Sequence, residues 1–296
     1  MKQRIQHIMK LSAGDRIFDG FNTAFMILFM FSCLYPFYYI FIYSISDPIQ
    51  ASKGVLFWPL EPTLANYIAV TSIRGIGKAV LVSIGRTVIG SALMVFCSSL
   101  LGYLVSRESM PLRKVVYRFF VITMYFSAGL IPVFILFKTL GLYNSFFVYI
   151  IPGAVAVFNM ILVKTSIEQL PASLEESAKL DGAGYFLIFR KIIFPLCLPI
   201  VATIALFGAV GQWNSWSDTL IFTTNKDLRS LQYVLYQLLK EASNIAKEAL
   251  EGKKIRTTPA AVKMTVTMVV TIPILLVYPF MQRYFVKGIM IGAIKG

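Results

Sequence analysis

The sequence lacks the groups that ATP hydrolysis, metal binding and acid–base catalysis commonly use. No G-x-x-x-x-G-K-[ST] phosphate loop occurs in its 296 residues, so the chain cannot bind ATP by that route. Its one histidine, His7, lies in a basic N-terminal stretch, so the apolar segments contain no Ser–His–Asp set. We therefore expect an enzyme activity, a metal site and a bound cofactor to be absent from this chain.

Charged residues and cysteines are also scarce. Only 14% of the residues are charged, 57% are hydrophobic and the mean hydropathy is +0.72, which places the chain among polytopic membrane proteins. Cys33, Cys97 and Cys197 all lie in apolar runs, where packing is their expected role. The net charge of +14 fits basic residues that flank membrane spans, so no nucleic-acid partner is expected.

Six segments are apolar enough and long enough, near 20 residues each, to cross a bilayer. They lie roughly at 20–45, 79–105, 115–137, 146–164, 193–216 and 264–284. The first resembles an uncleaved signal anchor, because no small-residue cleavage site follows it. No internal repeat is evident. The sequence therefore predicts an all-α polytopic membrane protein whose residues 1–296 form a single membrane domain.

Basic residues predict the orientation of these spans. They are denser in the N-terminal stretch, in 107–118, in 164–191 and after 283 than in the two shorter connections on the opposite side. By the positive-inside rule the denser side is cytoplasmic, so the N and C termini are both expected in the cytoplasm. The long connection at about 217–263 then lies outside. Leucines recurring between Leu228 and Leu239 predict an amphipathic helix within it.

The connection between the fourth and fifth spans, about 171–195, is unusually elaborate for a loop between spans. Ser173 and Glu176 have the S-x-x-E spacing of a capping box, which predicts a short helix from there to Leu180. Asp181-Gly182 should end that helix, because glycine accepts the left-handed conformation of a tight stop. A second short helix should start near Ala183. Taken alone, such a segment could also be an amphipathic helix on the membrane surface.

The run Glu176-Ser-Ala-Lys-Leu-Asp181-Gly182-Ala183, followed by Phe189, Pro195 and Pro199, closely resembles the EAA coupling loop of ABC importer permeases, the carbohydrate type in particular. It departs at Ser177, where the family commonly has alanine. Trp213-Asn214 matches a pair common in sugar permeases, and 282–288 with Lys295-Gly296 is similar to the tail of the maltose-type inner-membrane subunit.

The resemblance implies the type I ABC importer permease fold and a location in the bacterial cytoplasmic (inner) membrane. It implies a second related permease subunit, two ABC ATPase subunits that bind ATP and Mg, an extracellular or periplasmic sugar-binding protein, and lipid around the spans. The residues expected to couple to the ATPase are Glu175, Glu176, Ala178, Asp181, Gly182 and Ala183.

Polar residues inside spans usually face a cavity or another helix, so they are candidates for the substrate path. The candidates are Asn159 in the fourth span, Arg86 in the second, and Gln212, Trp213, Asn214 and Trp216 near Asp218 at the outer end of the fifth. Amides beside indoles suit sugar hydroxyls and C–H faces, although interfacial anchoring also explains tryptophans at that depth. Arg86 could reach the interface or bind an acidic sugar such as a uronate.

These observations favour a permease subunit of an ATP-driven ABC importer for oligosaccharides, working by alternating access. An ABC permease for a non-sugar solute is the first alternative. A stand-alone secondary transporter is a second, weakened because no acidic residue lies well inside a predicted span. A polytopic membrane enzyme is a third and lacks catalytic groups.

Overall fold

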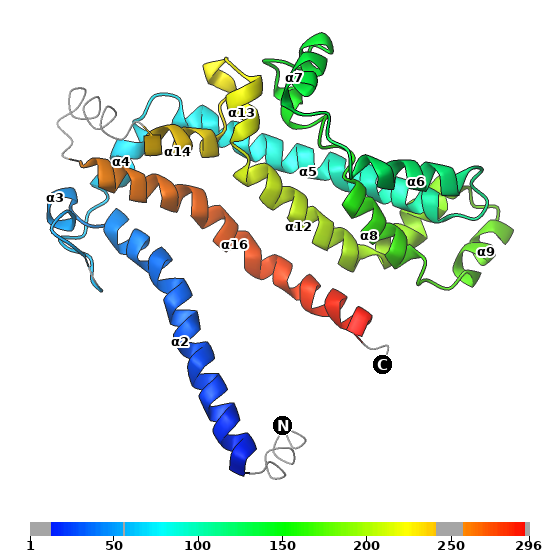
Figure 1. Ribbon diagram of the computed structural model, residues 1–296, viewed down its shortest axis with the longest axis horizontal. Helices are drawn as coiled ribbons and strands as arrows, with labels where there is room; N and C mark the ends of the chain where they lie inside the picture. Colours follow the sequence, from blue (N-terminus) through cyan, green and yellow to red (C-terminus); the bar gives the residue numbers. More distant parts are fainter. Residues whose placement is uncertain (1–12, 56, 241–256, 294–296) are drawn as a thin grey trace. The chain divides into compact units, whose positions relative to one another are not determined.

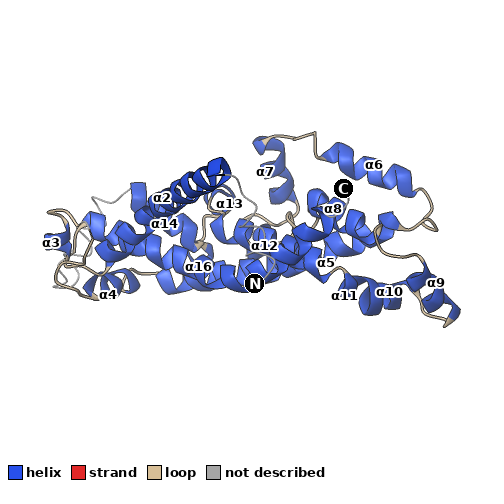
Figure 2. Ribbon diagram, turned by 90° about the horizontal axis from the view of Figure 1, so that it is seen from below, coloured by secondary structure: helices blue, strands red, loops and turns tan. Residues whose placement is uncertain are grey.

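A computed structural model describes residues 13–55, 57–240 and 257–293 (Figure 1). The elements within these ranges are helices joined by loops, and no strand occurs among them, which confirms the predicted all-α class (Figure 2). By their contacts, the described residues within 1–70 and 242–268 form one compact unit, and those within 71–241 and 269–296 form another. The two units are described separately.

The first unit contains helices α2 (Ala13–Ser44), α3 (Pro48–Ala51) and α4 (Ala65–Thr71). Asp47 caps α3, because its side chain accepts hydrogen bonds from the backbone N–H groups of Ile49 and Gln50 at 2.9 and 3.0 Å. The buried Asn66 amide donates to the carbonyls of Ser44 and Ser46. Asp47 and Asn66 thus fix the connection that follows α2.

Three helices form the centre of the second unit: α5 (Ile76–Ser106), α8 (Val157–Ile167) and α12 (Leu198–Asn214). Both α8 and α12 pack along α5, so α5 is the element that the other two share (Figure 1). Their common core includes Tyr103, Val163 and Ile204, each at most 1% exposed. The remaining helices of this unit are α6 (Arg113–Thr123), α7 (Leu130–Thr139), η1 (Phe146–Tyr149), α9 (Ser173–Leu180), α10 (Tyr185–Ile188), η2 (Phe189–Ile193), α11 (Phe194–Leu196), α13 (Ser217–Phe222), η3 (Lys226–Leu228) and α14 (Leu231–Lys240).

Three of the six predicted spans are long apolar helices. Residues 14–44, 76–106 and 259–277 each have the length and hydropathy needed to cross a membrane. They contain most of the predicted segments 20–45, 79–105 and 264–284, and the last belongs to helix α16 (Pro259–Ala293), which contributes residues to both units.

Two other predicted spans are not continuous helices. Within 115–137 the chain forms α6 and α7, and within 146–164 it forms η1 and α8, so neither segment is one continuous helix. Pro132 and Pro152 explain the interruptions, because a helix running through either would need a proline N–H and would clash with the ring. Gly129, with φ +81°, provides the turn before α7.

The predicted fifth span is bent. Helices 185–196 and 198–214 together are long and apolar enough to cross a membrane, but they meet at an angle of 84°. Pro195 and Pro199 lie in the first turns of α11 and α12, on either side of the bend, where a proline accounts for a sharp change of direction.

The predicted amphipathic helix is present as α14, which buries Leu231 and Leu238. Leu228 precedes it, in η3. The rest of the predicted outer connection, 241–256, lies outside the described residues, as do the basic N-terminal stretch 1–12 and Lys295-Gly296.

Candidate functional site

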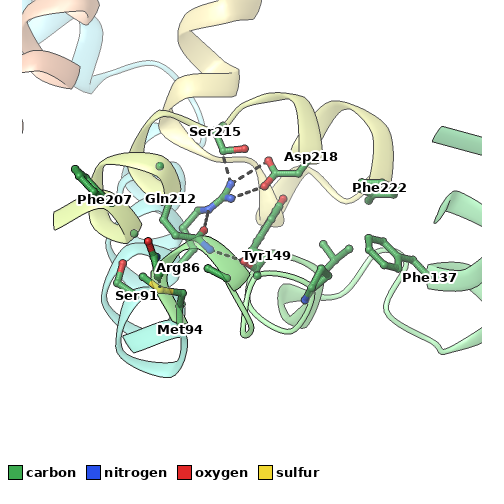
Figure 3. A pocket seen from close by; sticks show the side chains of 18 residues that line it. Arg86, Ser91, Met94, Phe137, Tyr149, Phe207, Gln212, Ser215, Asp218 and Phe222 are labelled. Carbon is green, nitrogen blue, oxygen red and sulfur yellow. Dashed lines mark hydrogen bonds and ion pairs between the residues drawn. The ribbon is translucent and has the colours of Figure 1, made fainter. Parts of the chain in front are cut away.

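A cavity of about 410 Å³ lies between the central helices of the second unit (Figure 3). Its volume is within the range of about 300–1,000 Å³ usual for small-molecule sites. The wall combines polar and aromatic side chains. It is formed by Arg86, Gly90, Ser91 and Met94 of α5, Phe137 of α7, Val148, Tyr149, Pro152, Gly153 and Ala156 between α7 and α8, Asn159 of α8, Phe207, Gly208, Gly211 and Gln212 of α12, and Ser215, Asp218 and Phe222 beyond it.

Arg86 is the buried cation of this wall, with 2% of its surface exposed. Its guanidinium is ion-paired to both carboxylate oxygens of Asp218. Its Nε donates to Gln212 Oε1 at 3.0 Å and its Nη1 donates to the Ser215 carbonyl at 3.3 Å. The group also lies 4.3 Å from the ring centre of Tyr149. The Arg86 charge is therefore compensated inside the protein.

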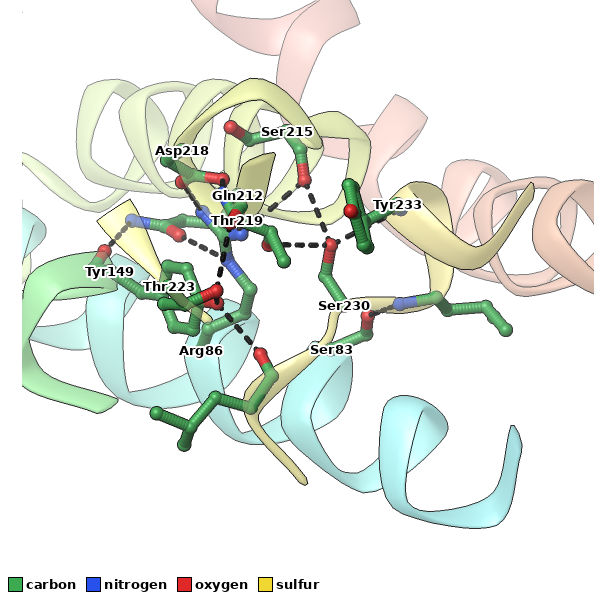
Figure 4. A network of polar contacts seen from close by, with 12 residues as sticks. Ser83, Arg86, Tyr149, Gln212, Ser215, Asp218, Thr219, Thr223, Ser230 and Tyr233 are labelled. Atoms are coloured by element: carbon green, nitrogen blue, oxygen red, sulfur yellow. Dashed lines mark hydrogen bonds and ion pairs between the residues drawn. The ribbon is translucent and has the colours of Figure 1, made fainter. Parts of the chain in front are cut away.

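The polar groups around Arg86 form a continuous network that joins α5, η1, α12, α13 and η3 (Figure 4). Gln212 Nε2 donates to the Tyr149 carbonyl at 2.9 Å, and the Tyr149 hydroxyl donates to the Leu228 carbonyl at 2.7 Å. Thr219 and Ser230 share a hydroxyl hydrogen bond of 3.0 Å. The network fixes α12, α13 and the start of α14 against α5.

Two polar groups on the opposite part of the wall have spare hydrogen-bonding capacity. The buried Ser91 hydroxyl has no hydrogen-bond partner among the described residues. The Asn159 amide donates to the Met94 sulfur at 3.0 Å, and a thioether is a weak acceptor. Because unpaired buried polar groups are costly, these two groups are suited to bind hydroxyls of a molecule in the cavity.

The structure separates the six predicted substrate-path residues into two sets. Arg86, Asn159 and Gln212 line the cavity, whereas Trp213, Asn214 and Trp216 are not among its lining residues. The three side chains outside the cavity have partners elsewhere. Trp213 Nε1 donates to the Val270 carbonyl at 3.0 Å, Asn214 bonds to Val210 and Gln232, and the Trp216 ring stacks on Tyr236 with centres 4.1 Å apart.

Other cavity residues were missed by the sequence analysis. Ser91 and Tyr149 gave no signal, since a serine in an apolar helix and a tyrosine near a helix end are both common. Asp218 was noticed only as a neighbour of the tryptophans. Its pairing with Arg86 joins positions 132 residues apart, which no local pattern reveals.

The segment 171–195 forms a second candidate site. Helix α9 ends at Leu180 and Gly182 has φ +79°, which confirms the predicted helix end and glycine turn. The capping box is wrong, because Ala172 is the N-cap and Ser173 is already in the helix, with no side-chain cap. The second helix begins at Tyr185, two residues later than predicted.

The predicted coupling residues point in different directions. Glu176, Asp181 and Gly182 are exposed, whereas Ala178 is buried in the core that contains Tyr103, and Ala183 is half-buried against it. Glu175 is 5% exposed and forms ion pairs with Arg107 and Lys179. The segment thus has one side attached to the helical core and one side open.

Residues 94–291, more than half of the chain, match the family described as "Binding-protein-dependent transport system inner membrane component". The chain is 38% identical to the polygalacturonan/rhamnogalacturonan transport system permease protein YtcP of Bacillus subtilis (strain 168) over 95% of this chain and 99% of the relative. It is 27% identical to the arabinooligosaccharides transport system permease protein AraQ of Halalkalibacterium halodurans, over 82% and 83% of the two chains.

Among solved structures, the fold is similar to a chain of a bacterial ABC transporter involved in the import of the acidic polysaccharide alginate. The TM-score is 0.87 with 30% identity, and the likeness covers 93% of this chain and 99% of the other. A chain of the alginate transporter complexed with its pentasaccharide-bound periplasmic protein matches with a TM-score of 0.56 and 13% identity, which indicates a shared fold.

Proposed function

The chain belongs to the family of binding-protein-dependent transport system inner membrane components, and we propose that it is a permease subunit of an ATP-driven ABC importer for oligosaccharides. The observation that carries the proposal is the nearly full-length likeness to a permease named for polygalacturonan and rhamnogalacturonan transport. The cavity supports it, because hydroxyl-binding groups such as Ser91 and Asn159 stand beside aromatic side chains.

We propose that the imported oligosaccharides contain uronic acids. Two of the similar proteins are named for acidic polysaccharides, polygalacturonan/rhamnogalacturonan and alginate. Sugar units of this kind carry hydroxyls, apolar C–H faces and a carboxylate. The cavity wall has Ser91 to bind a hydroxyl and the ring of Phe207 to pack on a C–H face, whereas a carboxylate would bind the Arg86 guanidinium only in place of Asp218.

The proposed importer complex contains this chain, a second related permease subunit, two ATPase subunits that bind ATP and Mg, and a sugar-binding protein on the outside. Glu176, Asp181 and Gly182 form the open side of the coupling segment, where a groove of the ATPase could receive α9 as a helix-in-groove contact. ATP-driven closure of the two ATPase subunits would then switch the membrane helices between inward-open and outward-open states.

Uptake by the reconstituted complex tests this function. With the ATPase subunits, sister permease and binding protein in proteoliposomes, we expect ATP-dependent accumulation of oligogalacturonides. Neutral oligosaccharides of the same length should compete poorly. Uptake by this chain alone, without an ATPase, would instead indicate a secondary transporter, and ATP-dependent uptake of an unrelated solute would indicate the non-sugar alternative.

We further propose six crossings in the cytoplasmic membrane, with both termini in the cytoplasm. In this topology the broken segments around α6–α7 and η1–α8 would each make one crossing. The coupling segment would then lie inside and α14 outside.

Labelling single cysteines tests the topology. In a variant lacking Cys33, Cys97 and Cys197, a cysteine at Lys240 should react with a membrane-impermeant maleimide added from outside. A cysteine at Lys179 should react only after the membrane is opened. Both positions are exposed in the structure, so poor accessibility would not explain a failure. The reverse pattern would contradict the orientation and the assignment of the coupling segment together.

A further inference from the structure

Two adjacent glutamates of helix α9 occupy opposite environments. The Glu176 side chain is exposed, whereas the Glu175 side chain is 7% exposed and forms an ion pair with Arg107. Lys179 Nζ lies 3.4 Å from Glu175 Oε1, and the Tyr103 hydroxyl donates to the same oxygen at 3.4 Å. Three groups therefore hold the Glu175 carboxylate on the side of α9 that faces the protein.

Arg107 immediately follows the last residue of α5 and is tightly held there. Its backbone N–H donates to the Leu104 carbonyl, and its Nε and Nη2 both donate to Ser106 Oγ at 3.2 Å. Its guanidinium lies 4.9 Å from the ring centre of Tyr103. Burial lowers the pKa of Arg107 from its ordinary value, but an arginine remains protonated in proteins, so the pair keeps both charges.

Apolar packing reinforces the same junction. Ala178 of α9 is buried in one core with Tyr103 of α5, and Phe189 of η2 lies with its ring centre 5.4 Å from that of Tyr103. Movement of α9 would therefore act on the end of α5 through a charged contact and an apolar one.

Helix α5 extends from this junction to the cavity. Met94, Ser91, Gly90 and Arg86 line the cavity and belong to the same uninterrupted helix that ends at Ser106. At 1.5 Å per residue, the thirteen steps along the chain from Met94 to Arg107 span about 20 Å. A continuous helix transmits displacement over that distance with little bending, because its backbone hydrogen bonds are intact.

This inference rests on the function proposed above. We propose that the Glu175–Arg107 ion pair transmits movement of α9, caused by the ATPase subunits, to α5 and the cavity wall. Glu175 is then a positioning residue that acts through Arg107, and only Glu176 of the two glutamates faces the ATPase. A buried pair suits such a link, because separating its charges is costly and the two helices must move together.

Matched substitutions of the two glutamates test the link in the reconstituted complex, with transport and ATP hydrolysis measured together. In Glu175→Gln we expect the ATPase subunits to stay bound and to hydrolyse ATP, while the sugar transported per ATP falls about 5- to 150-fold, the usual range of coupling between two sites. Arg107→Gln should have the same effect. Glu176→Gln should instead weaken binding of the ATPase subunits, because the Glu176 side chain is on the exposed side of α9.

The charge-reversed double variant Glu175→Arg/Arg107→Glu separates a coupling role from a folding defect. It should recover a large part of the transport per ATP that each single reversal loses. If Glu175→Gln weakens ATPase binding as Glu176→Gln does, or if it leaves transport per ATP at the wild-type value, the link is wrong. A wild-type complex that fails to import any oligosaccharide with ATP would instead contradict the proposed function.

Discussion

Replacing Asp218 by alanine should lower the free energy of unfolding by about 3–5 kcal/mol, the cost of removing one partner of a buried ion pair. The reason is the position of Arg86, which is 2% exposed and would keep its charge without a carboxylate beside it. Gln212 and the Ser215 carbonyl would remain as partners, but neither carries a charge. Thermal unfolding of the purified protein in detergent measures the loss, and oligosaccharide uptake should fall with it.

The matched control is the ion pair of Lys78 and Asp227. These side chains are 2.8 Å apart but each is 62% exposed, so Asp227→Ala should cost about 0–1 kcal/mol. The double variant Arg86→Gln/Asp218→Asn should be milder than Asp218→Ala, because it leaves no charge unpaired. Equal, small effects of Asp218→Ala and Asp227→Ala would show that the Arg86 charge is compensated by other means.

The same pair offers a further readout of substrate recognition. A uronate carboxylate would bind the Arg86 guanidinium only in place of Asp218, so the double neutral variant, which has no guanidinium at this position, should lose preference for acidic over neutral sugars. If Arg86→Gln/Asp218→Asn still prefers acidic over neutral sugars, another part of the importer binds the uronate carboxylate.

Local sequence signals predicted the end of α9 within the segment 171–195, but not its start. The end of α9 depends on Gly182 itself, whose positive φ is a property of one residue, and so it could be predicted. The start of the helix was predicted wrongly because the S-x-x-E pattern of a capping box is short and fixes only two residues. The carbonyls of Pro171 and Ala172 already accept from Leu174 and Glu176, so the helix begins before Ser173 can act as its cap.

The partners of several candidate site residues could not be predicted from the sequence, because they lie far away along the chain. Arg86 was expected either to reach the interface or to bind substrate, but it pairs with Asp218 in a helix far along the chain. Trp213 was a candidate sugar contact, yet its indole donates to the Val270 carbonyl of α16. Glu175 and Glu176 looked equivalent, and only the position of Arg107 distinguishes them. In each case the deciding partner lies more than fifty residues away.

Gly102→Val should destabilise the protein by about 1–3 kcal/mol, the usual cost of overpacking a close contact. Among the glycines of α5, Gly102 lies closest to α8. A Cβ added at Gly102 would lie 3.0 Å from the Met160 carbonyl oxygen and 3.1 Å from Val163 Cβ. Small residues at such crossings allow helices to pack closely in membranes. Because the backbone of α8 cannot yield as a flexible side chain can, the two helices must separate.

Gly77→Val is the control on the same helix, since a Cβ at Gly77 meets nothing within 4 Å. Both variants carry a valine in α5, so the difference between them isolates the contact with α8 from the helix propensity of valine. The effect should reach the cavity, because α8 also carries Asn159. We therefore expect Gly102→Val to lower both the melting temperature and oligosaccharide uptake, and Gly77→Val to leave both near the wild-type values. Equal behaviour of the two variants would mean that α5 and α8 can move apart without loss, and that their close packing does not position the cavity wall.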